Sequence, residues 1–463
     1  MRHSKLVTIS LAVAWGCAGS GYAPPTPPTF MAEEIAAARG TAPAVPPQQS
    51  AAAYPSPGPK RVTLAQAIAE CFDADPVIQA GAQSIVQARA DLWTASLLPN
   101  PTLEGGGTLL PLGEKLTPEH PGGPPQYGAG VAFPVDWLLF GKRWTAVDSA
   151  RAALDVSAAQ FADLVRQRIA ATVSAFYGVL QAEELLELAK QTQENLKHLE
   201  AITAELVQIG GAGTVELDRV RLMVLDGQRE LRAREGDVAI AKAALRSQLG
   251  RAAPEPEFDV DGSLDIPQPV PPPPLEQSLG LAEQNRPDLV SGKLQIAKAE
   301  ADYRSEQAKA FPEVTPRLGY VRQLQHDIGD PDLNLWEFSV EMTLPVFDRN
   351  QGNLEKARSV LVQANSAYRA QRVQLRAELE QATQALAVAY AAVTTDAPAR
   401  IAAARNVRDK IVAAYQAGGR PLIDVLDAER AYRDSARLDV LDRATYWKSL
   451  HLLNAVVGKE MLR

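Results

Sequence analysis

No proline occurs from Lys142 to Ile209, and this stretch has the pattern of one continuous helix. Such a helix would be about 100 Å long at roughly 1.5 Å per residue, far beyond the usual globular helix. Alanines between the apolar positions let neighbouring helices approach closely. The sequence therefore predicts an elongated helical bundle. The apolar positions recur every three or four residues, at Phe161, Leu164, Val165, Ile169, Val173, Phe176 and Leu180.

Glycine-rich turns follow the long helical patterns in both halves of the chain. The first is VQIGGAGTVELDRVR at Val207 to Arg221, and the second is YQAGGRPLIDVLDAERAY at Tyr415 to Tyr432. Glycine adopts positive φ at helix ends and Pro421 suits the first turn of a new helix, so each stretch predicts a tight helical hairpin. The glycines assigned to these turns are Gly210, Gly211, Gly213, Gly418 and Gly419.

The second half of the chain repeats the first. Pro76, Pro134 and Gly141 lie 211 positions before Pro287, Pro345 and Gly352, whereas Gly210 and Gly250 lie 208 before Gly418 and Gly458. The second long helix is therefore three residues shorter than the first. A deletion of three residues shifts the heptad phase as a stutter does. Pro398, which the first copy lacks, is the predicted site of a kink. We assign residues 61–253 to the first repeat, 254–274 to a proline-rich irregular crossover and 275–463 to the second repeat.

Shorter elements complete each repeat. A helix is expected from Thr63, whose hydroxyl can cap it together with Gln66, and another after Asp75-Pro76. A further helix is expected over Val215 to Leu249, and strands over Thr102 to Leu112 and Tyr127 to Val135. The predicted fold class is mainly α with a small β part.

The clearest strand is WEFSVEMTL, at Trp336 to Leu344. Every second residue, from Trp336 to Leu344, is large and apolar, and the four residues between them are polar. This is the lipid-out, water-in pattern of a membrane strand. A half-buried strand of a soluble sheet would show the same alternation. Because four strands cannot close an aqueous barrel alone, the membrane interpretation requires an oligomer.

The first 17 residues have the pattern of an export signal, with Arg2 and Lys5 before an apolar run. Ala14-Trp15-Gly16-Cys17 resembles a lipobox, in which Cys17 would be lipidated; ordinary cleavage near Ala23 is the alternative. Residues 18–60 are rich in proline and predict a loose tether. No later segment has about eighteen consecutive apolar residues, so a membrane span in the mature chain would have to be β.

Composition and motifs exclude several functional classes. The net charge of −8 opposes nucleic-acid binding, which needs a basic surface. Two cysteines and five scattered histidines form no metal-ligand pattern, and we predict no metal site. The sequence contains no hydrolase, phosphate-loop or nucleophile motif, so neither enzymatic activity nor a cofactor is expected.

Taken together, these features resemble the TolC-type outer-membrane efflux family. The resemblance rests on the duplicated layout, on TLPVFDRNQGNLEKAR at Thr343 to Arg358 and on YQAGGRPLIDVLDAER at Tyr415 to Arg430. It implies a homotrimer in which each subunit gives four strands to a shared barrel in the outer-membrane lipid and its long antiparallel helices to a periplasmic α-barrel tunnel. PVFDRNQGN, with FGKRW at the matching place of the first half, is most similar to the cobalt-zinc-cadmium branch.

The resemblance also implies roles for residues at the glycine turns, which would lie at the periplasmic tips where the tunnel narrows and an adaptor protein docks. Tyr415 and Arg420 would be latch residues of the closed state, with Glu216 as their acidic partner. Asp424 and Asp427 would form two carboxylate rings that attract cations. The alternative for both aspartates is an exposed first helical turn, where they favour the helix dipole without any pore.

The function implied is a passive exit duct that works with a periplasmic adaptor and an inner-membrane pump of the resistance-nodulation-division type, and that exports heavy-metal cations. Export of drugs or other small organic solutes is the alternative within this class. A soluble periplasmic coiled-coil scaffold is the alternative from another class, and the alternating pattern of Trp336 to Leu344 speaks against it.

Overall fold

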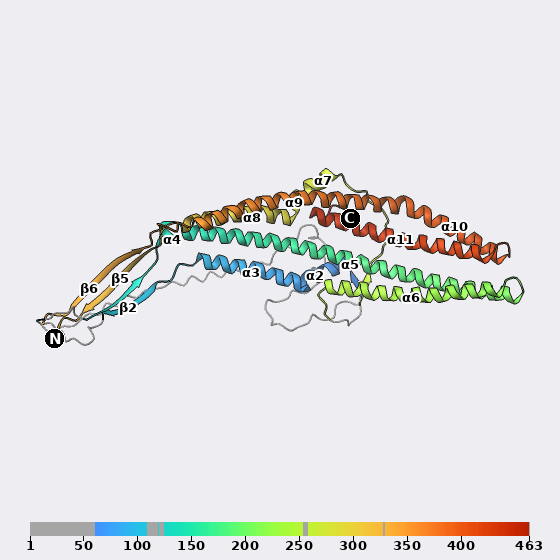
Figure 1. Cartoon of the computed structure of the whole chain (residues 1–463). Helices are drawn as coiled ribbons and strands as arrows, with labels where there is room; N and C mark the ends of the chain where they lie inside the picture. Colours follow the sequence, from blue (N-terminus) through green and yellow to red (C-terminus); the bar gives the residue numbers. More distant parts are fainter. Residues whose placement is uncertain (1–60, 109–118, 120–124, 253–257, 327–328, 463) are drawn as a thin grey trace.

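In the computed structural model the protein is a long, narrow molecule, with strands at one end and two helical hairpin turns at the other (Figure 1). The structure describes residues 61–108, 119, 125–252, 258–326 and 329–462. The predicted signal, Cys17 and the tether lie outside these residues. None of the helices in the part described combines the length and apolarity needed to cross a membrane.

The first repeat begins with β1 (Arg61–Thr63), α2 (Leu64–Ala74) and α3 (Pro76–Ser96). The predicted capping box at Thr63 is confirmed: its hydroxyl accepts the Gln66 backbone N–H at 3.3 Å, and the Gln66 side chain accepts the Thr63 N–H at 3.0 Å. The repeat continues with β2 (Thr102–Thr108), β3 (Gln126–Ala132), α4 (Asp136–Leu139), α5 (Lys142–Gln208) and α6 (Thr214–Gln248). The prediction of one uninterrupted long helix is confirmed, since α5 contains 67 residues.

In the second repeat the long helices and the paired strands follow one another in the same order as in the first. This repeat comprises α7 (Leu275–Asn285), α8 (Pro287–Lys309), β5 (Val314–Gln323), β6 (Leu333–Met342), α9 (Gln351–Ala391), α10 (Ala397–Gln416) and α11 (Leu422–Val457). A π-helical turn, η3 (Ala392–Asp396), joins α9 to α10 just before Pro398. Proline has no N–H to continue the α-helical ladder, and a wider turn lets the chain pass that position. The second long helix is thus interrupted where the sequence predicts it.

The helices form four columns along the long axis. Two columns consist of two helices end to end, α3 with α6 and α8 with α11, while α5 and the α9–α10 helix form the other two (Figure 1). Helix α5 packs against α3, α6, α8 and α11, and the α9–α10 column packs against α8 and α11. The order across the molecule is therefore α3/α6, α5, α8/α11 and α9/α10, which leaves the first and last columns with one free edge each.

A four-stranded antiparallel sheet with the order β2-β3-β5-β6 forms the other end. Its register pairs Thr102 with Ala132, and Tyr320 with Trp336. The alternation expected for Trp336 to Leu344 places the apolar residues Trp336, Phe338, Val340 and Met342 on one face of the sheet and the polar residues between them on the other. All ten residues of β6 are exposed in the single chain.

The crossover contains one element that its sequence does not predict. Strand β4 (Asp259–Asp261) pairs in parallel with β1, with Val62 opposite Val260. The following residues pack across α11: the Trp447 indole N–H donates to the Leu264 carbonyl at 3.2 Å. The crossover therefore ties the first repeat to the last helix of the second.

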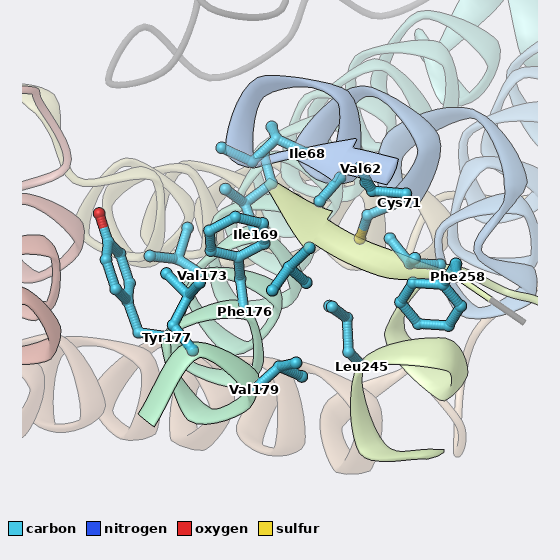
Figure 2. Packing of buried hydrophobic residues seen from close by; sticks show 14 of the residues in the cluster. Val62, Ile68, Cys71, Ile169, Val173, Phe176, Tyr177, Val179, Leu245 and Phe258 are labelled. Carbon is cyan, nitrogen blue, oxygen red and sulfur yellow. The ribbon is translucent and has the colours of Figure 1, made fainter. Parts of the chain in front are cut away.

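Separate hydrophobic clusters stabilise the columns along their length. The largest joins α2, α5 and the β1–β4 pair, and Figure 2 shows Ile68, Cys71, Ile169 and Phe176 directed into it. Cys71 lies within this cluster, and its side chain is fully buried. A second cluster joins α7, α9 and α11, and a third lies near the hairpin turns.

The junction between α2 and α3 and the equivalent junction between α7 and α8, here called elbows, carry opposite charges. Asp75, between α2 and α3, accepts from the Arg168 guanidinium at 2.6 Å. At the equivalent elbow between α7 and α8, Arg286 donates to Glu378 of α9 at 2.6 Å. Both elbow side chains are buried. If an elbow packed on the long helix of the other repeat, Asp75 would face Glu378 and Arg286 would face Arg168. The charges therefore favour packing of each elbow on the long helix of its own repeat.

Both elbows rest on a left-handed glycine. Gly250, with φ of 70°, ends the α6 segment against the Ala74 carbonyl, and Gly458, with φ of 76°, ends α11 against the Asn285 carbonyl. A Cβ at Gly250 would overlap that carbonyl. The elbows thus share one backbone geometry and differ in charge.

Candidate functional site

The two hairpin turns lie together at the end of the molecule opposite the sheet, and both have the same backbone (Figure 1). Gly210 and Gly418 adopt φ of 77° and 75°. The following N–H groups bond back to the helices they leave, Gly211 to the Leu206 carbonyl and Gly419 to the Ala414 carbonyl, each at 2.8 Å. This is the Schellman arrangement, in which a left-handed glycine lets the next residue satisfy an open helix carbonyl.

The other glycines of the turns have ordinary backbone angles. Gly211, Gly213 and Gly419 have no positive φ, and Gly213 precedes α6 in an extended conformation. Pro421 likewise precedes α11 and lies one position before its first turn. Of the five glycines assigned from sequence, two therefore carry the conformational requirement of the turns.

The two hairpins pack on each other just behind the turns. Side chains from both hairpins form the small apolar cluster there, with Leu199, Val220, Tyr415, Leu422, Val425 and Leu426 buried. Tyr415 is 4% exposed, and its hydroxyl lies 3.2 Å from the Oγ1 atom of Thr203, which is fully buried on α5. The Thr203 hydroxyl donates to the Leu199 carbonyl at 2.8 Å, so Tyr415 is the donor in the bond between the hairpins.

The charged residues of the tips occupy the surface. Arg420 forms an ion pair with Asp424 one turn away, at 3.2 Å, and its side chain is 62% exposed. Asp427 is exposed, and no ion pair involves it among the residues described. Glu216 lies half-buried in the first turn of α6, beside Val215, which is 64% exposed.

Within one subunit the predicted latch residues therefore have other partners. Tyr415 bonds to Thr203, and Arg420 bonds to Asp424, whereas no hydrogen bond or ion pair joins either residue to Glu216 in the described part of the chain. A contact of Arg420 with Glu216 of a neighbouring subunit stays a prediction. Thr203 was not identified from sequence; its signal is a hydroxyl residue within the apolar stripe that contains Leu199 and Leu206.

A second group of residues with functional character is the exposed apolar face of the sheet. The side chains that share this face are Leu103, Val131, Leu318, Tyr320, Trp336, Phe338, Val340 and Met342. Trp336 and Phe338 are 77% and 72% exposed. On the opposite face Arg317 pairs with Glu104 at 2.9 Å. A continuous apolar face of this kind is covered by lipid or protein in the native environment.

Comparison with known proteins identifies relatives of this chain by sequence and by structure. The profile of the family described as outer membrane efflux protein matches residues 68–251 and 279–459. The cobalt-zinc-cadmium resistance protein CzcC of Cupriavidus metallidurans is 25% identical over 377 residues, covering 81% of this chain and 85% of the relative. The probable outer membrane lipoprotein SilC of Salmonella typhimurium is 26% identical over 279 residues, 59% of either chain.

Solved structures share the fold. The outer membrane channel CmeC of Campylobacter jejuni superimposes with a TM-score of 0.72 at 15% identity, covering 86% of this chain and 87% of the channel. At that level of identity the likeness concerns the fold alone. The duplicated arrangement of strands, long helices and hairpin turns described above is therefore also that of a solved outer-membrane channel.

Proposed function

The chain belongs to the outer membrane efflux protein family, and we propose that it is the exit duct of a tripartite efflux system whose cargo is heavy-metal cations. The family consists of channels rather than enzymes, and its members are placed in the outer membrane with a helical tunnel in the periplasm. The observation that carries the choice of cargo is the similarity to a cobalt-zinc-cadmium resistance protein over 81% of the chain.

We infer that the working unit is a homotrimer. The order β2-β3-β5-β6 leaves the outer edges of β2 and β6 without a partner in the described sheet, and exposed edges pair readily with strands of another chain. The α3/α6 and α9/α10 columns also have free edges, and both columns carry exposed apolar side chains, since Trp93 of α3 is 71% exposed and Val373 of α9 is 74% exposed. Pairing β6 with β2 of the next subunit would close the sheet and join these columns at the same time.

In this trimer the hairpin turns form the periplasmic mouth. Asp424 and Asp427 of three subunits would place carboxylates around the opening, where they attract cations. Tyr415, Arg420 and Glu216 would hold the mouth closed, and the turns with Gly210, Gly211, Gly213, Gly418 and Gly419 would contact a periplasmic adaptor. The adaptor would connect the duct to an inner-membrane pump of the resistance-nodulation-division type. Cys17 is the proposed lipid attachment site.

Deleting the gene from its host and measuring tolerance to cobalt, zinc and cadmium salts tests the cargo. We expect loss of metal tolerance and higher cellular metal content, both restored by the wild-type gene. Unchanged metal tolerance together with new sensitivity to dyes and organic antimicrobials would assign the duct to organic solutes. Formation of pores by the purified protein in planar bilayers tests the duct itself, independently of the cargo.

A further inference from the structure

The connection from β6 to α9, residues 344–350 and here called the β6–α9 turn, is held in place by its own polar side chains. The Asp348 carboxylate accepts the Asn350 backbone N–H at 2.8 Å, and the Asn350 amide donates to both the backbone carbonyl and the carboxylate of Glu306 on α8, each at 2.8 Å. The Gln351 side chain accepts the Arg349 backbone N–H at 2.7 Å. Asn350 has φ of 61°, a left-handed conformation that asparagine tolerates. The polar residues of the motif FDRNQGN therefore fix the backbone of the turn.

Two side chains of this motif take no part in holding the turn. Phe347 is 93% exposed, more than any other large apolar residue in the part of the chain described. Arg349 is also exposed, and among the described residues no hydrogen bond or ion pair involves its guanidinium group. The turn thus presents an aromatic ring and a free cation two positions apart on a fixed backbone. This combination is typical of segments that lie at a membrane surface, where apolar side chains meet the acyl chains and cations meet the headgroups.

The apolar side chains of the turn continue the apolar face of the sheet. The Thr343 N–H still bonds to the Glu313 carbonyl at 3.1 Å, so Leu344 follows Met342 on the same face, and Leu344 is 70% exposed. The other three connections between the sheet and the helices also carry exposed apolar side chains, among them Leu98, Leu139 and Phe311 (Figure 1). Because this apolar band is continuous with the apolar face of the sheet, both face the same lipid environment.

Arg358, in the second turn of α9, adds another free cation. It is exposed, and its side chain has no ion pair or hydrogen bond in the part of the chain that the structure describes. Arg376 lies five turns further along the same face of α9 and pairs with Glu276 of α7 at 3.4 Å. The face of α9 that carries Arg358 is therefore the face that α7 covers lower down.

We propose that the β6–α9 turn and Arg358 form a binding site for anionic phospholipids at the periplasmic surface of the outer membrane. Leu344 and Phe347 enter the edge of the acyl-chain layer, and Arg349 and Arg358 bind lipid phosphate groups, to which a planar guanidinium can donate two parallel N–H bonds. A lipid fits better than a water-soluble phosphate because the free cations adjoin an exposed aromatic ring.

The orientation of the site rests on the proposed function. In an exit duct the sheet lies in the membrane and the long helices lie in the periplasm, so the β6–α9 turn is at the boundary between them. Three copies of α7 on the inner side of the tunnel would obstruct its lumen. The α9 face shared by Arg358 and Arg376 therefore points outward, toward the membrane surface at its upper end.

The depth of the two arginines fits the headgroup layer. Arg349 precedes α9, and Arg358 lies about 10 Å along the helix from its first residue, at roughly 1.5 Å per residue. The headgroup layer on each side of a bilayer is about 5–8 Å thick, and a long arginine side chain can extend back toward it. Both guanidinium groups can therefore reach lipid phosphates while Phe347 contacts the acyl chains.

The equivalent connection of the first repeat lacks such free cations. Lys142 pairs with Asp136 at 2.9 Å. Arg143 donates to the Ser96 carbonyl at 2.9 Å and lies over the Trp144 ring, 5.1 Å from its centre. Both cations are used within the subunit, so the geometry assigns the anionic-lipid site to the second repeat alone, with one site per subunit.

The test uses the full-length protein purified in detergent and titrated with short-chain phosphatidylglycerol, short-chain phosphatidylethanolamine or glycerol 3-phosphate. The charge variant combines Arg349→Gln and Arg358→Gln. The control variant combines Lys356→Gln and Arg405→Gln, which remove two other exposed cations. Lys356 is two positions from Arg358 and so points to the other side of α9. A third variant, Phe347→Ser, removes the aromatic ring.

We expect the wild type and the control variant to bind phosphatidylglycerol alike and in preference to phosphatidylethanolamine. Each arginine near a membrane surface contributes about fivefold to the binding of anionic lipid, so the charge variant should bind phosphatidylglycerol at least about tenfold more weakly. Phe347→Ser should weaken the binding of both lipids by a similar factor, because it removes apolar contact and no charge. Equal affinity of the wild type and the charge variant, or no preference for the anionic lipid, would overturn the proposal. Displacement of the lipid by glycerol 3-phosphate would assign the arginines to a water-soluble phosphate instead.

Two further measurements separate this proposal from the proposed function and from subunit assembly. Analytical ultracentrifugation should give the same assembly for the wild type and all three variants. If Phe347→Ser dissociated into single subunits and still bound lipid as the wild type does, Phe347 would belong to a subunit contact and its assigned role would be wrong. In planar bilayers, a wild type without pores would contradict the duct function, whereas pores without a preference for phosphatidylglycerol would contradict the lipid site alone.

Discussion

The hydroxyl of Tyr415 on α10 donates a hydrogen bond to Thr203 on α5, at 3.2 Å, and so links the two helical hairpins of one subunit directly behind their turns. Both residues are buried in the apolar cluster of the tips. Any opening of the mouth that separates the hairpins must break this bond and expose the cluster. We propose that the contact belongs to the closed arrangement of the mouth.

Removing the bond should favour opening. We expect Tyr415→Phe and Thr203→Val each to raise single-channel conductance in planar bilayers, because a hydrogen bond of this kind stabilises the closed state by about 1 kcal/mol. The double variant should add little to either single variant, since both remove the same bond. Tyr432→Phe, a half-buried tyrosine of α11, is the control. Independent, additive effects of the two substitutions would contradict the linkage.

The two aspartates of the second tip should contribute unequally to cation attraction. The negative charge of Asp424 is partly neutralised by its ion pair with Arg420, whereas Asp427 has no ion pair in the described structure. We therefore expect Asp427→Asn to lower the cation-to-anion permeability ratio and weaken block by multivalent cations more than Asp424→Asn does. Asp155→Asn, an exposed change on α5 far from the turns, should have no effect. Indifference of the pore to both tip variants would remove these residues from the conduction path.

The turn glycines can be ranked by their backbone angles. Gly418→Ala should destabilise its turn by about 1–2 kcal/mol, because an L-residue is strained in the left-handed region although the surrounding space is open. Gly213→Ala should cost little, since its φ is −87° and nothing crowds it. Hydrogen exchange of the turn amides should therefore be about tenfold faster in the Gly418 variant. Equal exchange in the two variants would contradict this ranking.

The buried elbows should be far more sensitive than surface ion pairs. Asp75→Asn keeps an acceptor for the Val77 N–H but leaves the Arg168 guanidinium without its buried partner. We expect a loss of about 3 kcal/mol, seen as a lower denaturation midpoint. Asp148→Asn, which removes an exposed pair with Arg151, should change stability by less than about 1 kcal/mol. A similar loss of stability in the two variants would show that burial of the ion pair does not determine how much its removal destabilises the fold.

The sequence predicts those parts of the fold that local chemistry determines. The Thr63 cap, the glycine-ended helices, the break before Pro398 and the alternation around Trp336 depend on residues within a few positions of each other. The repeat then predicts how these elements are combined. Parallel pairing of β1 with β4 was not predictable, because nearly 200 positions separate the strands and each contains three residues.

The contacts of the candidate site depend on the relative placement of distant segments. Thr203 and Tyr415 are 212 positions apart, and neither has a local motif that identifies the other. A pocket over α5 likewise combines Arg229 with Arg430 and Arg437, which become neighbours only when α6 and α11 pack on α5. The opposite polarity of Asp75 and Arg286 is visible in the aligned repeats, but its meaning depends on which long helix each elbow contacts.

Acid sensitivity of the folded protein should depend in part on His451. Its ring stacks with Tyr177 and Trp447, its Nε2 atom lies 3.2 Å from the Tyr177 hydroxyl, and burial lowers the pKa of His451 to about 4. The unfolded chain, with an ordinary histidine pKa near 6.5, binds more protons between these values, so the stability of the fold falls as pH decreases from about 6.5 to 4. The expected loss approaches about 3 kcal/mol per subunit.

Replacing His451 with glutamine tests this linkage, because the amide keeps a partner for the Tyr177 hydroxyl and does not titrate. Thermal melting followed by circular dichroism should show a smaller fall in midpoint between pH 7 and pH 4.5 for His451→Gln than for the wild type. His198→Gln, at an exposed position of α5, should melt like the wild type at every pH. If both variants retain the full pH dependence, carboxylates such as Asp288, whose pKa is held low by the Arg286 guanidinium despite its burial, would account for it instead.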